Sequence, residues 1–360
     1  MIMKKICFAF LIFVLCAGHD MFLKLDTYIL PPNTAANIEL FNGTFELSEN
    51  TIDRNRMADV SLVGNGQRLV VDTAMWKEKD GVTILNFNTG AAGTWVAGVS
   101  TLPRNIEMNA EDFNGYLEHD GILDMLQWRK ENDALGKAAV EKYSKHVKTI
   151  FQVGEKRTAD WQKNLGYPIE FIPLNNPYDM HIGDALSVEL LWQGQPLRNQ
   201  LVYVGSDAKQ QGHAHDHDHE EGADHHHHGE GIMQMRTDES GMLSFKVTDN
   251  GRWYLRTIHL VPSEETGLTH ESNWATLTFQ VGHDHSHAVA EHSHGEDGHS
   301  HGADGHTHAE DGHSHEDGDH HHHADEDTIG VPPYAYWIGS FLIIAGLFFW
   351  FNRQENTDLE

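Results

Sequence analysis

The sequence contains very little cysteine. Only Cys7 and Cys16 occur among its 360 residues, and both lie within the first 18 positions. A disulfide framework is therefore excluded for the rest of the chain, even where it folds in an oxidising compartment. Its stability must come from a hydrophobic core, and the roughly 265 residues between the N-terminal segment and a histidine-rich tail are enough for one or two domains.

Basic residues are also scarce. The chain has 25 Lys and Arg residues against 54 Asp and Glu residues, which gives a formal net charge of −29 with histidine neutral. Such a charge repels nucleic acids and anionic surfaces and attracts cations. We therefore expect no nucleic-acid partner, and we expect metal ions among the partners.

The common local signatures of catalysis are missing. The sequence has no Gly-x-Ser-x-Gly, no P-loop, no His-Glu-x-x-His and no Cys–His pair. Paired carboxylates are plentiful in so acidic a chain, and for that reason they do not indicate a catalytic site. We predict that the protein is not an enzyme.

Histidine, in contrast, is abundant and concentrated, because 23 of the 29 histidines fall in two tracts. The first tract contains His213, His215, His217, His219, His225, His226, His227 and His228. The second contains His283, His285, His287, His292, His294, His299, His301, His306, His308, His313, His315, His320, His321, His322 and His323. Between Gly282 and Thr328 the second tract also has 13 acidic residues and no Lys or Arg.

The spacing of these histidines is typical of metal binding. Three consecutive seven-residue repeats begin His-Ser-His or His-Thr-His, so neighbouring imidazoles can chelate one ion. Imidazole nitrogen suits Ni²⁺, Co²⁺, Zn²⁺ and Cu²⁺, and the interleaved carboxylates add oxygen ligands. The alternative is that both tracts are solvated, pH-responsive spacers, since they lack the apolar residues needed to bury a core. An inert spacer would more naturally be rich in Gly, Ser or Pro, which favours metal binding.

The two ends of the chain predict export and anchoring. Residues 1–18 have a basic start, an apolar stretch and small residues at the end, as in a secretory signal peptide. Near the other end, the uncharged run 334–351 follows Pro332 and Pro333 and is long enough for one transmembrane helix. We therefore predict a transmembrane helix at 332–351, a cytoplasmic stub at 352–360, and a location at the inner membrane of a bacterial envelope, with the bulk of the chain in the periplasm.

The region between the ends has the pattern of a mainly β fold. Short apolar or alternating runs separated by turn residues predict β-sandwich domains of the immunoglobulin or transthyretin type at 19–108 and 165–282. The charge-rich segment 109–164 changes period and predicts a helical insertion of two or three helices that extends to about residue 154. The first histidine tract would form a loop at 205–235, and 283–331 would be a disordered tail.

Several segments of this region resemble a family of exported bacterial proteins of unknown function that is grouped with NikM-type periplasmic components of nickel and cobalt uptake. The resemblance covers about residues 19–282 and implies a role linked to metal transport, with subunits of a membrane transporter as partners. The matching segments are 19–24 (His-Asp-Met-Phe-Leu-Lys), 30–33 (Leu-Pro-Pro-Asn), 42–45 (Asn-Gly-Thr-Phe), 116–121 (Tyr-Leu-Glu-His-Asp-Gly), 143–148 (Tyr-Ser-Lys-His-Val-Lys), 165–168 (Leu-Gly-Tyr-Pro), 251–254 (Gly-Arg-Trp-Tyr) and 271–277 (Glu-Ser-Asn-Trp-Ala-Thr-Leu).

His19 is the most specific candidate metal ligand outside the tracts, because it lies close to the predicted cleavage point. If cleavage follows Gly18, the free amine and the imidazole of His19 can chelate one ion; if it follows Cys16, an Ala-Gly-His terminus offers a square-planar nitrogen site for Cu²⁺ or Ni²⁺. Asp20 would be a ligand or would support one. The alternative is a surface histidine at the start of a strand.

Three further residues of the predicted folded region are candidates. His119 and Asp120 lie together at a predicted helix end, where a solvated acidic turn is the alternative. His259 lies in a predicted strand, where a lone histidine is more often a packing residue. A tight site requires three or four such ligands to converge in space.

Taken together, these patterns predict a membrane-anchored periplasmic protein that captures Ni²⁺, Co²⁺ or Zn²⁺ and supplies a membrane transporter. Two alternatives stay open. One is a copper enzyme with an N-terminal histidine brace at His19, which requires a second histidine nearby. The other is an adhesion or assembly sandwich whose tracts are inert spacers.

Overall fold

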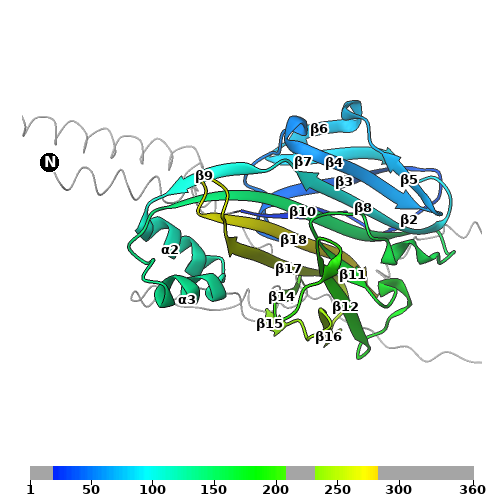
Figure 1. Ribbon diagram of the computed structural model, residues 1–360. Helices are drawn as coiled ribbons and strands as arrows, with labels where there is room; N and C mark the ends of the chain where they lie inside the picture. The colour runs from blue at the N-terminus through cyan, green and yellow to red at the C-terminus, as the bar shows by residue number, and fades with distance from the viewer. Residues whose placement is uncertain (1–18, 208–231, 283–360) are drawn as a thin grey trace, which may run out of the picture. The chain divides into compact units, whose positions relative to one another are not determined.

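The computed structural model describes residues 19–207 and 232–282 (Figure 1). The predicted signal peptide, both histidine tracts, the tail, the transmembrane segment and the stub lie outside these residues. Within the described part, no helix is both long enough and apolar enough to cross a bilayer.

The prediction of a mainly β fold is confirmed (Figure 1). The strands are β1 (Asp20–Lys24), β2 (Ile29–Leu30), β3 (Ala35–Gly43), β4 (Met57–Gly64), β5 (Gln67–Val70), β6 (Trp76–Lys79), β7 (Val82–Asn88), β8 (Gly93–Thr101), β9 (Arg104–Met108), β10 (Ala139–Val153), β11 (Ile169–Pro173), β12 (Ala185–Trp192), β13 (Gln195–Pro196), β14 (Leu201–Ser206), β15 (Met233–Arg236), β16 (Met242–Lys246), β17 (Gly251–Pro262) and β18 (His270–Val281). The helices are α2 (Ala110–His119) and α3 (Leu123–Glu131), with short 3₁₀ turns η1 (Arg54–Arg56), η2 (Thr73–Met75), η3 (Ala159–Gln162) and η4 (Pro177–Asp179).

One large sheet extends through both predicted sandwich ranges. Its strand order is β15-β14-β17-β18-β10-β8-β4-β5, with β2 and β9 also paired to β10. The 15-residue β10 joins the two halves, since it pairs in parallel with β18 and antiparallel with β8 and β9. The parallel pairing brings together residues that lie about 130 positions apart, such as Lys145 and Trp274.

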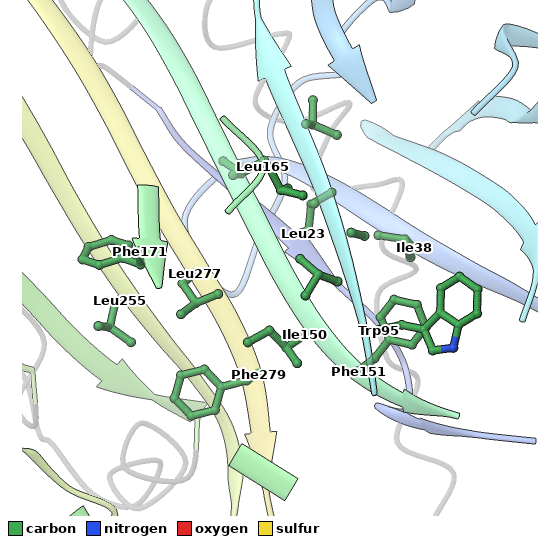
Figure 2. Close-up of a cluster of buried hydrophobic side chains, with 14 of the residues drawn as sticks. Leu23, Ile38, Trp95, Ile150, Phe151, Leu165, Phe171, Leu255, Leu277 and Phe279 are labelled. Atoms are coloured by element: carbon green, nitrogen blue, oxygen red, sulfur yellow. The ribbon is translucent and has the colours of Figure 1, made fainter. Parts of the chain in front are cut away.

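Two smaller sheets pack against the large one and bury the core. The first has the order β1-β3-β7-β6, and the second contains β11, β12, β13 and β16. The Phe87 and Phe151 rings meet at 5.6 Å between the first small sheet and the large sheet, and the Phe245 and Trp253 rings stack at 5.8 Å at the second. Figure 2 shows this continuous apolar cluster, to which β10 and β18 contribute on the large-sheet side, for example through Ile150.

The predicted helical insertion is correct for α2 and α3 and wrong for 139–153, which form the strand β10. The physical reason lies in the burial of β10. From Ser144 to Val153 every residue is buried, so the strand lacks the alternation that identifies a half-exposed strand. Its charged residues contributed to the prediction of a helical insertion, but several of these side chains are buried and hydrogen-bonded.

The clearest example is an ion pair between the large sheet and β11. Lys148 and Glu170 meet at 2.9 Å, and both side chains are 1% exposed. The Lys148 ammonium also donates to the carbonyls of Lys163 and Phe171 at 3.0 Å. Glu170 accepts from the backbone N–H groups of Leu165, Gly166 and Tyr167. The pair thus ties the loop before β11 to the centre of β10.

Candidate functional site

A pocket of about 300 Å³ lies at the end of the large sheet where β10 and β18 begin. Alternate residues of a strand point to the same face, and the first half of β10 presents Glu141, Tyr143 and Lys145 to the pocket. β9, which pairs with this half of β10, adds Arg104, Ile106 and Met108. The remaining walls come from His19 and β1, β3, the loop 50–53, η1, α2 and Trp274 of β18.

Glu141 is the buried acid of the pocket, with a side chain that is 2% exposed. Its Oε1 accepts hydrogen bonds from the Ser272 hydroxyl and, at 3.3 Å, from the Tyr116 hydroxyl. Its Oε2 has no hydrogen-bond partner among the described residues. Burial raises the pKa of Glu141 to about 7, so the side chain changes charge near neutral pH.

Lys145 is the buried base, with a side chain that is 8% exposed. Its ammonium donates to the His19 carbonyl and to Asn42 Oδ1 at 3.3 Å, and it lies 5.0 Å from the Trp274 ring centroid. No carboxylate of the described residues lies within ion-pair distance of it. Burial lowers the pKa of Lys145 to about 8, although nearby carboxylates, Asp20 first among them, oppose this.

Two arginines complete the positive lining of the pocket. Arg56 in η1 lies 5.9 Å from the Tyr143 ring centroid, and Arg104 in β9 is opposite Tyr143 in the sheet. Burial is the main cause of the lowered pKa of Arg56, and the charge of Arg104 acts in the same direction. Neither guanidinium forms an ion pair with a described carboxylate, although the exposed Asp53 also lines the pocket.

The predicted ligand His19 lines this pocket, whereas Asp20 points to a different partner. The His19 Nδ1 atom lies 3.4 Å from Glu49 Oε2, and the side chain is 22% exposed. Asp20 Oδ2 lies 2.8 Å from Nε of Arg256 in β17. Burial raises the pKa of Asp20, and the charge of Arg256 opposes this effect.

His119 and Asp120 lie near the same arginine, Arg256. The His119 side chain is 65% exposed, and its Nδ1 atom lies 2.9 Å from Asp120 Oδ1, a hydrogen bond that raises the pKa of His119. Arg256 donates to the Asp120 carbonyl at 3.0 Å. The fold therefore gathers Asp20, His119 and Asp120 around one guanidinium, which supplies the positive charge between the carboxylates.

His259 does not join this group. Arg256 and His259 are three residues apart on one strand, so their side chains point to opposite faces of the sheet. The His259 ring packs 4.9 Å from the Trp192 ring, and its Nδ1 atom lies 2.9 Å from Gln200 Oε1. Within residues 19–207 and 232–282, no three His, Cys, Asp or Glu side chains come together in a group that could hold a metal ion. Metal ligation by these five core residues stays a prediction.

Sequence reasoning missed the main residues of the pocket. Glu141 and Lys145 lie within the predicted helical insertion, and on a helix they would not share one face with Tyr143. The signal that identifies them is the alternation Glu141, Tyr143, Lys145, once the segment is read as a strand whose following residues are all buried. No local sequence pattern marks Arg56 and Arg104 as pocket residues, because only the fold brings them close to β10.

The points where the two histidine tracts join the fold lie at one end of the large sheet. Ser206 of β14 is opposite Trp253 of β17, and Gly251 of β17 is opposite Val281 of β18. At a strand spacing of about 4.8 Å, the ends of β14 and β18 are roughly 10 Å apart. The pocket is at the other end, since Lys145 is opposite Trp274, seven residues before Val281 and thus roughly 23 Å along β18.

Comparison with known proteins identifies the family of this chain. The model of a domain of unknown function, DUF4198, matches residues 16–261. No curated protein matches the chain significantly.

Similar solved structures are distant from this chain. They include a DUF4785 family protein from Legionella pneumophila, with 11% identity, a TM-score of 0.20, and coverage of 65% of this chain and 50% of that chain. Trypsin-activated alpha-2-macroglobulin from Escherichia coli has 9% identity, a TM-score of 0.17, and coverage of 73% and 16%. The adhesin InvE from Yersinia pseudotuberculosis has 14% identity, a TM-score of 0.18, and coverage of 72% and 58%.

The chain therefore spans half or less of the first two of these structures, and at such TM-scores the likeness carries no argument about function. The family match, in contrast, covers more than half of the chain. The protein belongs to the DUF4198 family, which is defined by a domain of unknown function.

Proposed function

We propose that this protein collects divalent transition-metal ions, Ni²⁺, Co²⁺ or Zn²⁺, in a bacterial envelope and supplies them to a membrane transporter. The observation that carries the proposal is the concentration of 23 of the 29 histidines in two tracts rich in Asp and Glu. Imidazole binds these ions as a neutral ligand, and the surrounding negative charge raises their local concentration.

The arrangement of the strands supports cooperation between the tracts. Both are tethered to one end of the large sheet, at Asp207 and Ile232 for the first and at Gly282 for the second. Tethering two weak binding segments at such a distance turns the second binding event into an intramolecular one and raises the overall affinity. Asp207 itself is held by Arg252, which donates to it from its backbone N–H at 2.9 Å and from Nε at 2.6 Å.

The anchor and the transporter belong to the same proposal. A transmembrane helix at 332–351 would hold the second tract next to the membrane, where captured ions are released close to a transporter subunit. The sequence resemblance to NikM-type components of nickel and cobalt uptake supports this assignment.

Metal titration of the full chain tests the first part of the proposal. We expect the wild-type protein to bind several Ni²⁺ ions, as measured by equilibrium dialysis with metal analysis. Replacement of all 23 tract histidines by Asn, which preserves length and acidity, should reduce binding to one ion or none. As a matched control, replacement of the 13 acidic residues of the second tract by Asn or Gln should weaken binding but keep its stoichiometry.

Equal stoichiometry in the wild type and the histidine-free variant would overturn the proposal. Binding of one ion by the histidine-free variant that is lost on His19→Ala would assign a core site to His19. The supply function is tested by the metal content of cells grown under nickel, cobalt or zinc limitation. If cells with the histidine-free variant accumulate as much metal as cells with the wild type, the protein does not supply a transporter.

A further inference from the structure

The pocket at the start of β10 and β18 lies at the end of the sheet opposite to the points where the tracts join it, and His19 is the only candidate metal ligand of the described residues in its lining. Its volume of about 300 Å³ is at the lower end of the range of ligand pockets, which suits a small metabolite. Its lining combines charged groups with aromatic and aliphatic side chains.

The interior of the pocket contains polar groups with unused bonding capacity. Glu141 is 2% exposed, yet its Oε2 atom lacks a hydrogen-bond partner among the described residues. A buried polar atom without a partner costs stability and calls for an explanation, and a bound ligand is one. Lys145, four residues further along β10, is also buried, has no carboxylate within ion-pair distance in the described part of the chain, and lines the same pocket.

The charges of the pocket differ in sign from the rest of the chain. The protein as a whole carries a formal charge of −29, but Lys145, Arg56 and Arg104 converge on the pocket. The opposing acids are Glu141, which is neutral when protonated, and Asp53, which is exposed. Cations that are held together without ion-pair partners form a site for an anion.

The walls limit the kind of anion. Tyr143, Trp274 and Tyr116 contribute aromatic surface, and Met21 and Met108 contribute aliphatic surface. A bare inorganic anion would leave these walls uncovered, whereas an organic molecule would fill them. A protonated Glu141 can donate a hydrogen bond from Oε2 to an oxygen of such a molecule, and the guanidinium groups of Arg56 and Arg104 can donate to its carboxylate group.

We propose that this pocket binds a small organic carboxylate, with its carboxylate group held by Arg56, Arg104 and Lys145, its body against Tyr143 and Trp274, and a hydrogen bond to Glu141. This proposal is independent of the metal-collecting function. The two therefore succeed or fail separately.

The test is isothermal titration calorimetry of the full chain at pH 6 with benzoate, succinate and inorganic phosphate as probes. We expect saturable one-to-one binding of at least one carboxylate and weaker binding of phosphate. The double variant Arg56→Gln/Arg104→Gln should bind that carboxylate at least tenfold more weakly, because these side chains are not part of the buried core. Arg198→Gln is the matched control: Arg198 is an exposed arginine that follows β13 and pairs with Glu239, and its replacement should leave the affinity unchanged.

A second variant examines the interior. Glu141→Leu should weaken carboxylate binding, and Glu141→Gln should largely restore it, because an amide can donate the same hydrogen bond. Circular dichroism confirms that each variant is folded. Three results would overturn the proposal: no saturable carboxylate binding, equal affinity in the arginine double variant, or phosphate bound as tightly as the carboxylates.

Discussion

Replacement of Glu141 by Gln should stabilise the protein at neutral and alkaline pH. Glu141 is buried at the pocket, and among the described residues only the Ser272 and Tyr116 hydroxyls donate hydrogen bonds to the charge that ionisation places there. Gln has the same shape, accepts the same two hydrogen bonds and carries no charge. The variant therefore removes the cost of a buried charge and leaves the packing nearly unchanged.

The size and the sign of the effect follow from the pKa of Glu141, which is about 7 in the fold against an ordinary value of 4.5. Between these two values the folded state holds a proton that the unfolded state has lost, so the free energy of unfolding falls as the pH rises through this window. At about 1.36 kcal/mol for each pKa unit, the loss above pH 7 amounts to about 3 kcal/mol. The Gln variant does not suffer this loss.

Urea unfolding at a series of pH values from 4.5 to 8, followed by circular dichroism, measures the prediction. The free energy of unfolding of the variant minus that of the wild type should rise by about 3 kcal/mol from pH 4.5 to 7 and then stay level. The contributions of the other titrating groups to the pH dependence are the same in both proteins and cancel in this difference. A flat difference, or a variant that is less stable than the wild type at pH 8, would refute the reasoning.

Three further predictions concern stability. Lys148→Met leaves the Glu170 carboxylate buried without its cation and should reduce the free energy of unfolding by about 3–5 kcal/mol. The double variant Lys148→Met/Glu170→Leu should lose less stability than this single variant, and a loss in the single variant no larger than in the double variant would contradict the prediction. Arg198→Gln breaks an exposed pair and should change the urea midpoint by less than the equivalent of about 1 kcal/mol, and a larger change would show that the surface pair matters. His146 is buried and hydrogen-bonded to Ser100, and its pKa is lowered to about 4, mainly by burial. Below about pH 6.5 this histidine gains a proton in the unfolded state but not in the folded state, so the free energy of unfolding decreases as the pH falls from 6.5 to 4. The His146→Gln variant should lack this decrease. Parallel pH profiles of the free energy of unfolding for the two proteins would exclude the mechanism.

Strand positions were predictable wherever one face of a strand is exposed. β7, for example, alternates buried and partly exposed residues from Val82 to Phe87, and this pattern is visible in the sequence. β10 was not predictable in this way, because both of its faces are covered from Ser144 onwards and its polar residues are satisfied by partners from distant parts of the chain. His146, for example, is hydrogen-bonded to Ser100 and Asn273.

The candidate site was likewise predictable only in part. His19 was predicted as a functional residue from its position near the signal peptide, and it does line the pocket. The pairing of Asp20 with Arg256 was beyond sequence reasoning, because the two residues are brought together only when β1 packs near β17. The same holds for the approach of Arg56 and Arg104 to Glu141.

The sequence by itself determined the strand-rich character of the chain and the two histidine tracts, because both depend on local composition and spacing. The tertiary structure decided which charged residues are buried together, and therefore where the pocket lies. It did so through the parallel pairing of β10 with β18, which joins segments about 130 residues apart in a register that no local pattern encodes. The local sequence pattern determines which residues share a face of a strand, but only the packing of distant strands places Glu141, Lys145, Arg56 and Arg104 around one cavity.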